Sequence, residues 1–250
     1  FPRLDLQLDS IDREGGPSAS TGARVVLIER SDEILSPYHP TSRAYALEVL
    51  RSRGVEVMLG ESVIEVTAGE VRFASGRTLP TRTLVWAAGV QGHPLAAALG
   101  LPVGRAGRVE VEADLSIAAH PEIFVVGDLA LAKDRAGKPL PQLAPVAQQG
   151  AKHVAETIER RLTSQASKPF EYRDPGVMAT IGRHAAVTEL PSGLRLRGTL
   201  GWLAWLFLHL MQLVGFRNRL NVLINWAWNY FTYDRSARLI LPAPDRDLRD

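Results

Sequence analysis

The sequence predicts an α/β fold, and three observations carry that prediction. Short apolar runs typical of buried strands recur at residues 25–28, 55–59, 83–88 and 123–130. Helical patterns at residues 40–53 and 145–162 separate some of these runs, as expected where strands and helices alternate. Alternating apolar and polar residues around Gly69 and Gly76 indicate an antiparallel meander that begins near residue 63.

Length and composition limit the class of protein. A chain of 250 residues is long enough to bury a sizeable core. With 22% charged residues and a mean hydropathy of -0.03, it is not a polytopic membrane protein. The net charge of +2 is too small to indicate a nucleic-acid partner. Because cysteine is absent, disulfides, thiolate metal sites and a catalytic thiol are excluded within these residues.

The two predicted helices have recognisable starts and faces. Thr41 or Ser42 can cap the first helix, and Gly54 follows its end. Its apolar face comprises Ala46, Leu47 and Leu50. The second helix has Pro145 in its first turn. The face that we expect it to bury comprises Ala147, Ala151, Val154, Ala155, Ile158 and Leu162.

Residues 198–241 differ in composition from the rest of the chain. Residues 198–216 and 220–233 carry no charge, and the two stretches contain four of the five tryptophans. We predict amphipathic helices that lie on a membrane surface, with aromatic rings in the interface and arginines near lipid phosphate. The residues expected at the membrane are Trp202, Trp205, Trp226, Trp228, Arg217 and Arg219. A spanning helix at 198–216 and a buried hairpin in a soluble core are the alternatives.

Glu29 is the first candidate binding residue. It directly follows the apolar run at 25–28, where a nucleotide-binding domain places a carboxylate that accepts hydrogen bonds from the ribose hydroxyls of NAD. A solvated charge at a strand end is the alternative, since no glycine-rich turn precedes it.

A second candidate site combines Gly127 and Asp128 with the start of the helix at 145. Glycine lets the backbone approach a ligand, and a carboxylate at a strand end can accept a hydrogen bond from a sugar or ribityl hydroxyl. The positive end of the helix would suit an anion such as a reduced flavin, and Gln148 and Gln149 add amides there. Ordinary surface glutamines are the alternative.

Other chemistries find little support. The six histidines include no HExxH and no pair spaced for one helical face, so no metal site is predicted. A GxSxG elbow and a P-loop are also absent from the sequence, which argues against hydrolases and nucleoside triphosphatases.

Several segments together resemble the type II NADH:quinone oxidoreductases, FAD-dependent flavoproteins with two dinucleotide-binding (Rossmann-like) domains of the pyridine nucleotide-disulfide oxidoreductase superfamily. They are VVLIE, TLVWAAGV, GRVEVEADLSIAAHPEIFVVGD, PVAQQGAKHVA, ATIGRHAAV and the tryptophan-rich ending. The resemblance implies oxidation of NADH through FAD and reduction of a membrane quinone, without proton pumping. It also implies a peripheral position on the cytoplasmic face of a bacterial-type plasma membrane, and it allows a homodimer.

The resemblance also implies roles for individual residues. Glu29 would hold the adenosine ribose of NADH, Gly89 would approach the dinucleotides, and Gly127 and Asp128 would hold FAD. Near the flavin ring would lie Ala147, Gln148 and Gln149, the two glutamines also lining the mouth of the quinone site. The implied organisation is a junction at 1–22, the remainder of an NADH-binding domain at 23–88, the end of an FAD-binding domain at 89–197, membrane helices at 198–241 and a tail at 242–250.

The chain departs from this family in one respect. The family has a GxGxxG in each dinucleotide-binding domain, and none occurs in these residues. We therefore expect the chain to be the carboxyl-terminal half of an enzyme, or the product of an incomplete gene, that alone binds FAD poorly. The functional alternatives are a soluble reductase of the same superfamily acting on ferredoxin or a disulfide, and a non-catalytic membrane-binding or scaffold protein.

Overall fold

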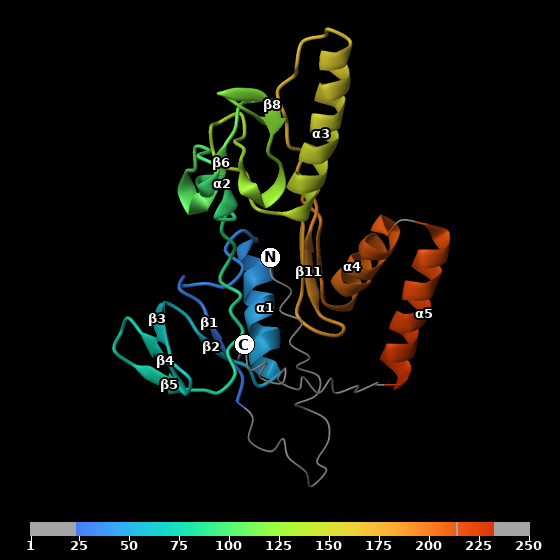
Figure 1. The fold of residues 1–250 in the computed structure, drawn as a ribbon. Coiled ribbons are helices and arrows are strands. Elements are labelled where there is room, and N and C mark those ends of the chain that lie inside the picture. Colours follow the sequence, from blue (N-terminus) through green and yellow to red (C-terminus); the bar gives the residue numbers. More distant parts are fainter. Residues whose placement is uncertain (1–23, 214, 233–250) are drawn as a thin grey trace, which may run out of the picture.

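The computed structural model describes residues 24–213 and 215–232, and it begins with a parallel βαβ unit (Figure 1). Strand β1 (Val26–Ile28) pairs in parallel with β2 (Glu56–Met58), and helix α1 (Pro40–Ser52) connects them. These elements confirm the predicted α/β start. The cap differs from the prediction, because His39 occupies the cap position and its Nδ1 accepts the Thr41 N–H at 3.3 Å. The expected junction at 1–22 and tail at 242–250 lie outside the described residues.

The predicted meander is confirmed. Strands β3 (Val63–Val66), β4 (Glu70–Phe73) and β5 (Thr78–Pro80) form an antiparallel sheet in sequence order. Val71 and Phe73 are two residues apart and therefore point to the same face of β4. There they form a small buried cluster with Met58 of β2. The meander is thereby attached to the βαβ unit.

The strand predicted at residues 83–88 is wrong. The structure has no strand there, and Val85 and Trp86 are 64% and 63% exposed. A strand buried on both faces needs neighbours on both edges and a cover on each face. None of the described strands pairs with this segment, so its apolar composition is not matched by burial within the described part of the chain.

Short strands and turns form the next unit, which begins with helix α2 (Leu95–Ala98). Strand β6 (Val109–Glu110) pairs in parallel with β9 (Ala130–Leu131), and β7 (Ser116–Ile117) pairs with β8 (His120–Phe124). The apolar strand predicted at 123–130 is therefore wrong, because no single strand covers these residues. The chain instead leaves β8, which is largely exposed, and passes through the 3₁₀ helix η3 (Gly127–Leu129).

Helix α3 (Ala144–Leu162) is confirmed within one residue, but its predicted buried face is wrong. Val146, Gly150 and Thr157 are buried, whereas Leu162 is 82% exposed. Gly150 explains why the helix buries a different face from the predicted one. A Cβ at this position would stand 3.4 Å from Leu115, so the missing side chain lets the helix approach the unit below it closely.

The carboxyl-terminal part consists of a three-stranded sheet and two helices. Strands β10 (Val177–Thr180), β11 (Ala186–Glu189) and β12 (Arg195–Arg197) are antiparallel. Residues of this sheet share a buried cluster with α1. Helix α4 (Gly198–Gln212) packs on β11, and α5 (Phe216–Thr232) follows it (Figure 1). No helix in the described ranges is both long enough and apolar enough to cross a membrane.

Candidate cofactor site

The structure brings Gly127 and Ala147 into contact. Gly127 has a φ of +69°, and a Cβ added there would stand 3.3 Å from the Ala147 Cβ. The position therefore favours glycine twice, by its backbone conformation and by the space available. As a result η3 lies directly against the first turns of α3. The two predicted parts of the site, Gly127–Asp128 and the start of the helix, are therefore adjacent.

The start of α3 can attract an anion through its dipole. Leu143 occupies the cap position with an extended backbone, no side chain caps the helix, and its first turn contains no acidic residue. The amides of Val146 and Ala147 already donate to the Leu143 carbonyl, at 3.0 and 3.2 Å. The helix start would therefore attract an anion mainly through the partial positive charge of the helix dipole, because two of its amides already have acceptors.

The two glutamines differ in their surroundings. Gln149 is half-buried, and its carboxamide pairs with the backbone of Arg173, accepting the N–H at 3.0 Å and donating to the carbonyl at 2.9 Å. Gln148 is exposed and has no hydrogen-bond partner within the described residues. Gln149 therefore ties residue 173 to the helix, while Gln148 is available to a ligand.

Asp128 presents an exposed carboxylate beside the helix start. Its backbone carbonyl accepts a hydrogen bond from the Gln142 Nε2 at 3.0 Å, which fixes η3 to the segment before α3. Its charge also acts on Arg108, where burial lowers the pKa of the guanidinium and Asp128 partly restores it. Sequence reasoning missed Gln142 and Arg108, although both lie within the segments that frame the site.

Glu29 lies in the other unit of the fold, at the carboxyl end of β1. Its N–H donates to the Met58 carbonyl at 2.9 Å, and its Oε1 accepts the Ser31 N–H at 2.8 Å. The second carboxylate oxygen has no hydrogen bond within the described residues. The side chain is half-buried, and the Ser31 amide fixes the orientation of its carboxylate.

Gly89 lies in the segment that joins the two units. Its φ is +103°, and nothing stands within 4 Å of the place where a Cβ would be. The conformation favours glycine, and the open space leaves room for another group to approach the backbone. No described residue supplies that group.

The residues predicted at the membrane lie in α4 and α5, and most of their rings make contacts inside the protein. Trp205 stacks on His209 at 4.0 Å and lies 6.3 Å from Trp226, and Trp202 lies 4.9 Å from His184. Trp228 alone of the four is largely exposed, at 64%. The Arg219 Nε donates to the Leu213 carbonyl at 2.8 Å, whereas Arg217 is exposed.

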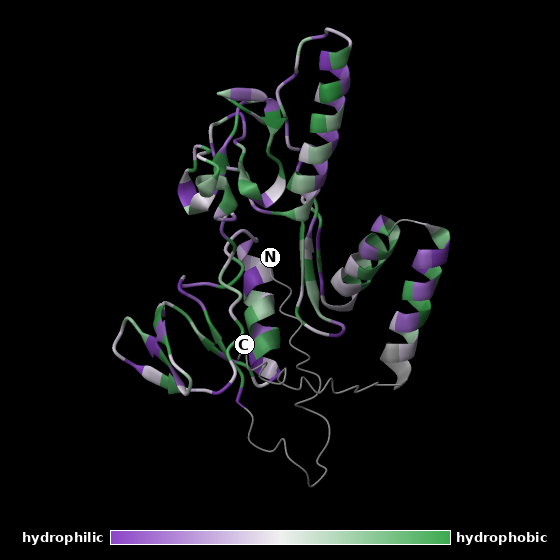
Figure 2. Ribbon diagram, in the orientation of Figure 1, coloured by the Kyte–Doolittle hydropathy of each residue, from purple (hydrophilic) through white to green (hydrophobic). Residues whose placement is uncertain are grey.

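Aliphatic and phenylalanine side chains instead make up most of the exposed apolar surface of this hairpin. Figure 2 shows hydrophobic and hydrophilic residues in alternate bands along α5. The exposed apolar residues are Leu200, Leu203, Phe207, Leu208, Met211, Phe216, Leu220, Leu223, Ile224 and Trp228. Within the described part of the chain, no cluster of acidic residues and histidines could hold a metal ion.

Comparison with known proteins decides the family. The pattern of the pyridine nucleotide-disulphide oxidoreductases matches residues 16–151, which is more than half of the chain. The chain belongs to this family. A second pattern, the NDH2 C-terminal domain, matches residues 175–233 of the chain. The resemblance drawn from the sequence is therefore confirmed.

Individual relatives agree with this assignment. The chain is 37% identical to the type II NADH:quinone oxidoreductase Ndh of Mycobacterium tuberculosis over 232 residues, which cover 88% of the chain and 49% of that protein. It is 32% identical to a mitochondrial internal alternative NAD(P)H-ubiquinone oxidoreductase of Arabidopsis thaliana, over 83% of the chain and 44% of that protein. The chain thus spans about half the length of the curated relatives it matches.

Solved structures show the same fold. The NDH2 of Plasmodium falciparum, in complex with NADH, superimposes with a TM-score of 0.73 at 16% identity, covering 83% of this chain and 58% of that one. A ferredoxin reductase from Rhodopseudomonas palustris has a TM-score of 0.55 at 25% identity, covering 69% and 43%. This chain therefore shares more of its fold with that NDH2 than with that reductase.

Proposed function

We propose that this chain is the carboxyl-terminal part of a flavoprotein that oxidises NADH through FAD and reduces a membrane quinone without pumping protons. The match of residues 175–233 to the NDH2 C-terminal domain carries this proposal, because those residues include the β10–β12 sheet and the apolar hairpin α4–α5. In the proposed division, residues 23–88 belong to the NADH-binding domain and residues 89–197 to the FAD-binding domain.

The residues of the candidate site fit the sugar and ring portions of FAD. The missing side chain at Gly127 lets η3 pack against Ala147, the Asp128 carboxylate beside it can accept a hydroxyl hydrogen, and α3 directs its positive end to the same place. The bound flavin would supply the hydride and electron chemistry. Ala147 would keep the ring side of the site apolar and close to η3.

For the nicotinamide nucleotide, we propose that Glu29 accepts hydrogen bonds from both hydroxyls of the adenosine ribose. Its Oε1 already holds the Ser31 amide, so the carboxylate is oriented before the ligand arrives. A negative charge at this point would also repel the additional phosphate of NADP. Gly89 would let the dinucleotides pass close to the connecting segment.

For the quinone, we propose that Gln148 contacts the substrate and that Gln149 shapes the same wall. Gln148 is exposed and free to donate to a quinone oxygen, whereas Gln149 holds the backbone of Arg173 at the side of α3. Replacing Gln148 by a bulkier residue should slow reoxidation of the reduced flavin more than its reduction by NADH. Gln149→Leu should also lower stability.

We place the protein on the cytoplasmic face of a bacterial-type plasma membrane as a peripheral protein, with the lipid surface as a partner, and extend the proposal to a homodimer. The exposed apolar residues of α4 and α5 would enter the interface, with Trp228 and Arg217 at lipid headgroup level.

The membrane proposal is tested by flotation, and Phe207→Glu should reduce flotation with anionic vesicles. Ile64→Glu removes an equally exposed apolar residue of the meander and should leave flotation unchanged. Equal losses would contradict this orientation.

The catalytic proposal is tested on the complete polypeptide purified from membranes. We expect a yellow protein with non-covalent FAD that oxidises NADH when a short-chain quinone is present. A colourless protein that cannot be reconstituted with FAD would overturn the proposal. Electron transfer to a ferredoxin or a disulfide, without transfer to quinone, would support a soluble reductase instead.

A further inference from the structure

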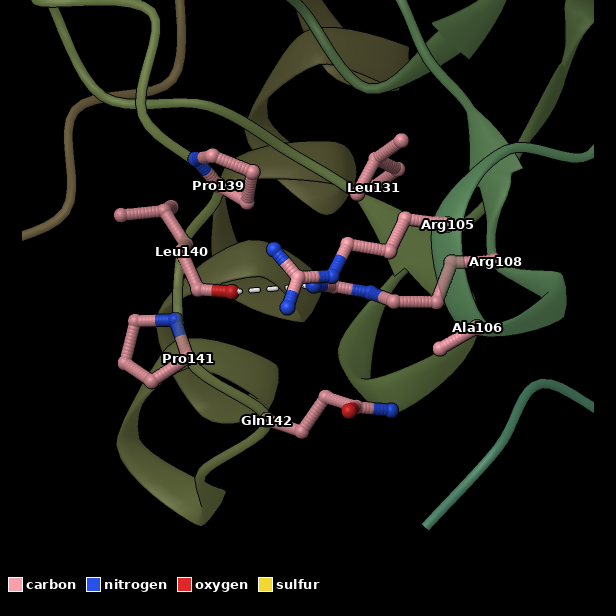
Figure 3. A pocket seen from close by; sticks show the side chains of 8 residues that line it. All are labelled: Arg105, Ala106, Arg108, Leu131, Pro139, Leu140, Pro141 and Gln142. Carbon is pink, nitrogen blue, oxygen red and sulfur yellow. Dashed lines mark hydrogen bonds between the residues drawn. The ribbon is translucent and has the colours of Figure 1, made fainter. Parts of the chain in front are cut away.

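A cavity of about 240 Å³ lies beside β9 and contains two arginines (Figure 3). Arg105 and Arg108 form one side of it, and the segment that includes Leu140 and Gln142 forms the other. No residue that lines the cavity is acidic. The proposed flavin and quinone contacts do not use this cavity.

Arg108 is a buried cation without a hydrogen-bonded carboxylate among the described residues. Its side chain is only 6% exposed, and its guanidinium donates to the carbonyls of Ala130 and Leu140. Three of its five N–H groups are used in this way, which leaves two donors. Burial lowers the pKa of Arg108, an effect that a bound anion would reverse.

Arg105 brings a second guanidinium to the same cavity. It is exposed and has no hydrogen bond or ion pair within the described part of the chain. Figure 3 shows both guanidinium groups directed toward Leu140. Two positive charges in one cavity repel each other, and an anion between them would offset this repulsion.

The backbone holds Arg105 in this position. The Gly104 N–H donates to the Arg108 carbonyl at 2.8 Å, and the Gly92 N–H donates to the Ala106 carbonyl at 2.8 Å. Gly92 and Gly107 pack so closely that a Cβ on Gly92 would stand 2.0 Å from the Gly107 oxygen. The backbone of the turn is thus fixed from both sides, so only the Arg105 side chain has to be ordered when a ligand binds.

We propose that this cavity binds a phosphoryl group, which Arg105 and Arg108 hold together with the Gln142 carboxamide at the rim. A phosphoryl dianion carries two charges and three acceptor oxygens, which match two guanidinium forks better than a single carboxylate does. The Gln142 Nε2 donates one of its two N–H groups to the Asp128 carbonyl, which leaves the second N–H for a phosphoryl oxygen. The site is separate from the proposed function and does not rest on it.

Two carboxylates near the cavity limit its affinity. Asp128 acts on Arg108 electrostatically, and the Glu110 Oε1 stands 3.1 Å from where a Cβ on Gly104 would be. Neither lines the cavity, and neither forms an ion pair with Arg105 or Arg108. They weaken the attraction for an anion but leave the donors available.

The test is titration of the full chain with orthophosphate and, separately, with ribose 5-phosphate, by calorimetry and by broadening of the 31P signal. Tighter binding of orthophosphate would identify a free phosphate site, and tighter binding of ribose 5-phosphate would identify a phosphomonoester site. Absence of binding by both would overturn the proposal. Ribose itself should not bind.

Substitution separates a specific site from general charge. Arg105→Ala should raise the Kd about tenfold or more, because it removes a charge-assisted contact. Arg105→Lys keeps the charge but loses the planar fork, so an intermediate Kd is expected. Arg82→Ala is the matched control, since Arg82 is also exposed and has no hydrogen bond within the described residues. Equal weakening by Arg105→Ala and Arg82→Ala would overturn the site, and circular dichroism verifies that each variant is folded.

Discussion

Strand β11 and the segment 83–89 are both rich in small and apolar residues, yet the strand is buried and the segment is exposed. Ala186, Val187 and Thr188 of β11 are completely buried, between β10 and β12 and beneath α4. In the other segment Val85 and Trp86 are almost two-thirds exposed. The difference lies in neighbours, because a strand is buried only where other strands and a covering layer are present.

The comparison shows what hydropathy reports. An apolar run indicates that a segment gains free energy when it is covered, but it does not identify the cover. Contiguous exposed apolar residues are typical of surfaces that another segment or molecule contacts. The same contrast, between covered and uncovered positions, can be measured one residue at a time.

The largest expected effect is a charge introduced into β11. Val187→Asp should destabilise the protein by about 3 kcal/mol or more, because it buries an unpaired carboxylate and removes packed methyl groups. Val85→Asp makes the same chemical change at an exposed position and should alter the free energy of unfolding by less than about 0.5 kcal/mol. Urea denaturation followed by circular dichroism measures both. Similar losses would show that the segment 83–89 is covered in solution.

The sequence could predict elements whose pattern is local. The first βαβ unit, the meander around Gly69 and Gly76, and α3 were all expected from spacing and turn residues, and the structure has them. Spacing and turn residues within its own stretch of the chain specify each of these elements.

Elements that depend on distant neighbours were predicted less well. The strand at 83–88 has no described partner, and the apolar run at 123–130 is divided by the turn at Gly127. On α3, a count of apolar residues misplaced the buried face, because Gly150 and Thr157 decide how closely the helix packs. For the site, the resemblance implied that Gly127 and Ala147 both lie beside FAD, whereas their contact and the pairing of Gln149 with Arg173 depend on tertiary structure.

The next effect concerns the covered glycine of η3. Gly127→Ala adds a Cβ that meets Ala147 at 3.3 Å and also forces alanine into a left-handed conformation, so we expect a loss of about 2 kcal/mol. Gly76→Ala carries the same conformational penalty at a φ of +82° but meets nothing within 4 Å, so about 1 kcal/mol is expected. The difference between the two midpoints in urea isolates the packing contribution. Equal losses would mean that η3 and α3 are loosely packed.

A smaller effect is expected at the ion pair between Arg161 of α3 and Asp114, which lies in the turn before β7. Burial raises the pKa of Asp114, but hydrogen bonds from Ser116 and Arg161 outweigh it and hold the pKa below its ordinary value. The stabilisation is therefore complete above the unfolded pKa of about 3.9 and is lost as the pH falls through the lower folded value. Asp114→Asn should cost about 1 to 2 kcal/mol at pH 7 and flatten the dependence of stability on pH below about 4. The test is to measure the free energy of unfolding of both proteins between about pH 2.5 and 7, which spans these pKa values. If its dependence on pH below about 4 has the same slope in both proteins, the prediction is contradicted.

The smallest effect on stability is expected at Trp86. There the exposure of the ring and its contribution to stability can be measured separately. Trp86 is 63% exposed, so Trp86→Phe should change the free energy of unfolding by less than about 0.5 kcal/mol. The same substitution should remove a large share of the tryptophan emission that acrylamide quenches, because a quencher reaches an uncovered ring first. Trp205→Phe is the matched comparison, since this ring stacks on His209 at 4.0 Å and is half-buried. Its loss should lower stability more and remove less of the quenchable emission. If the two variants exchange these properties, Trp86 is covered in solution and Trp205 is exposed, which would contradict the exposure of the segment 83–89.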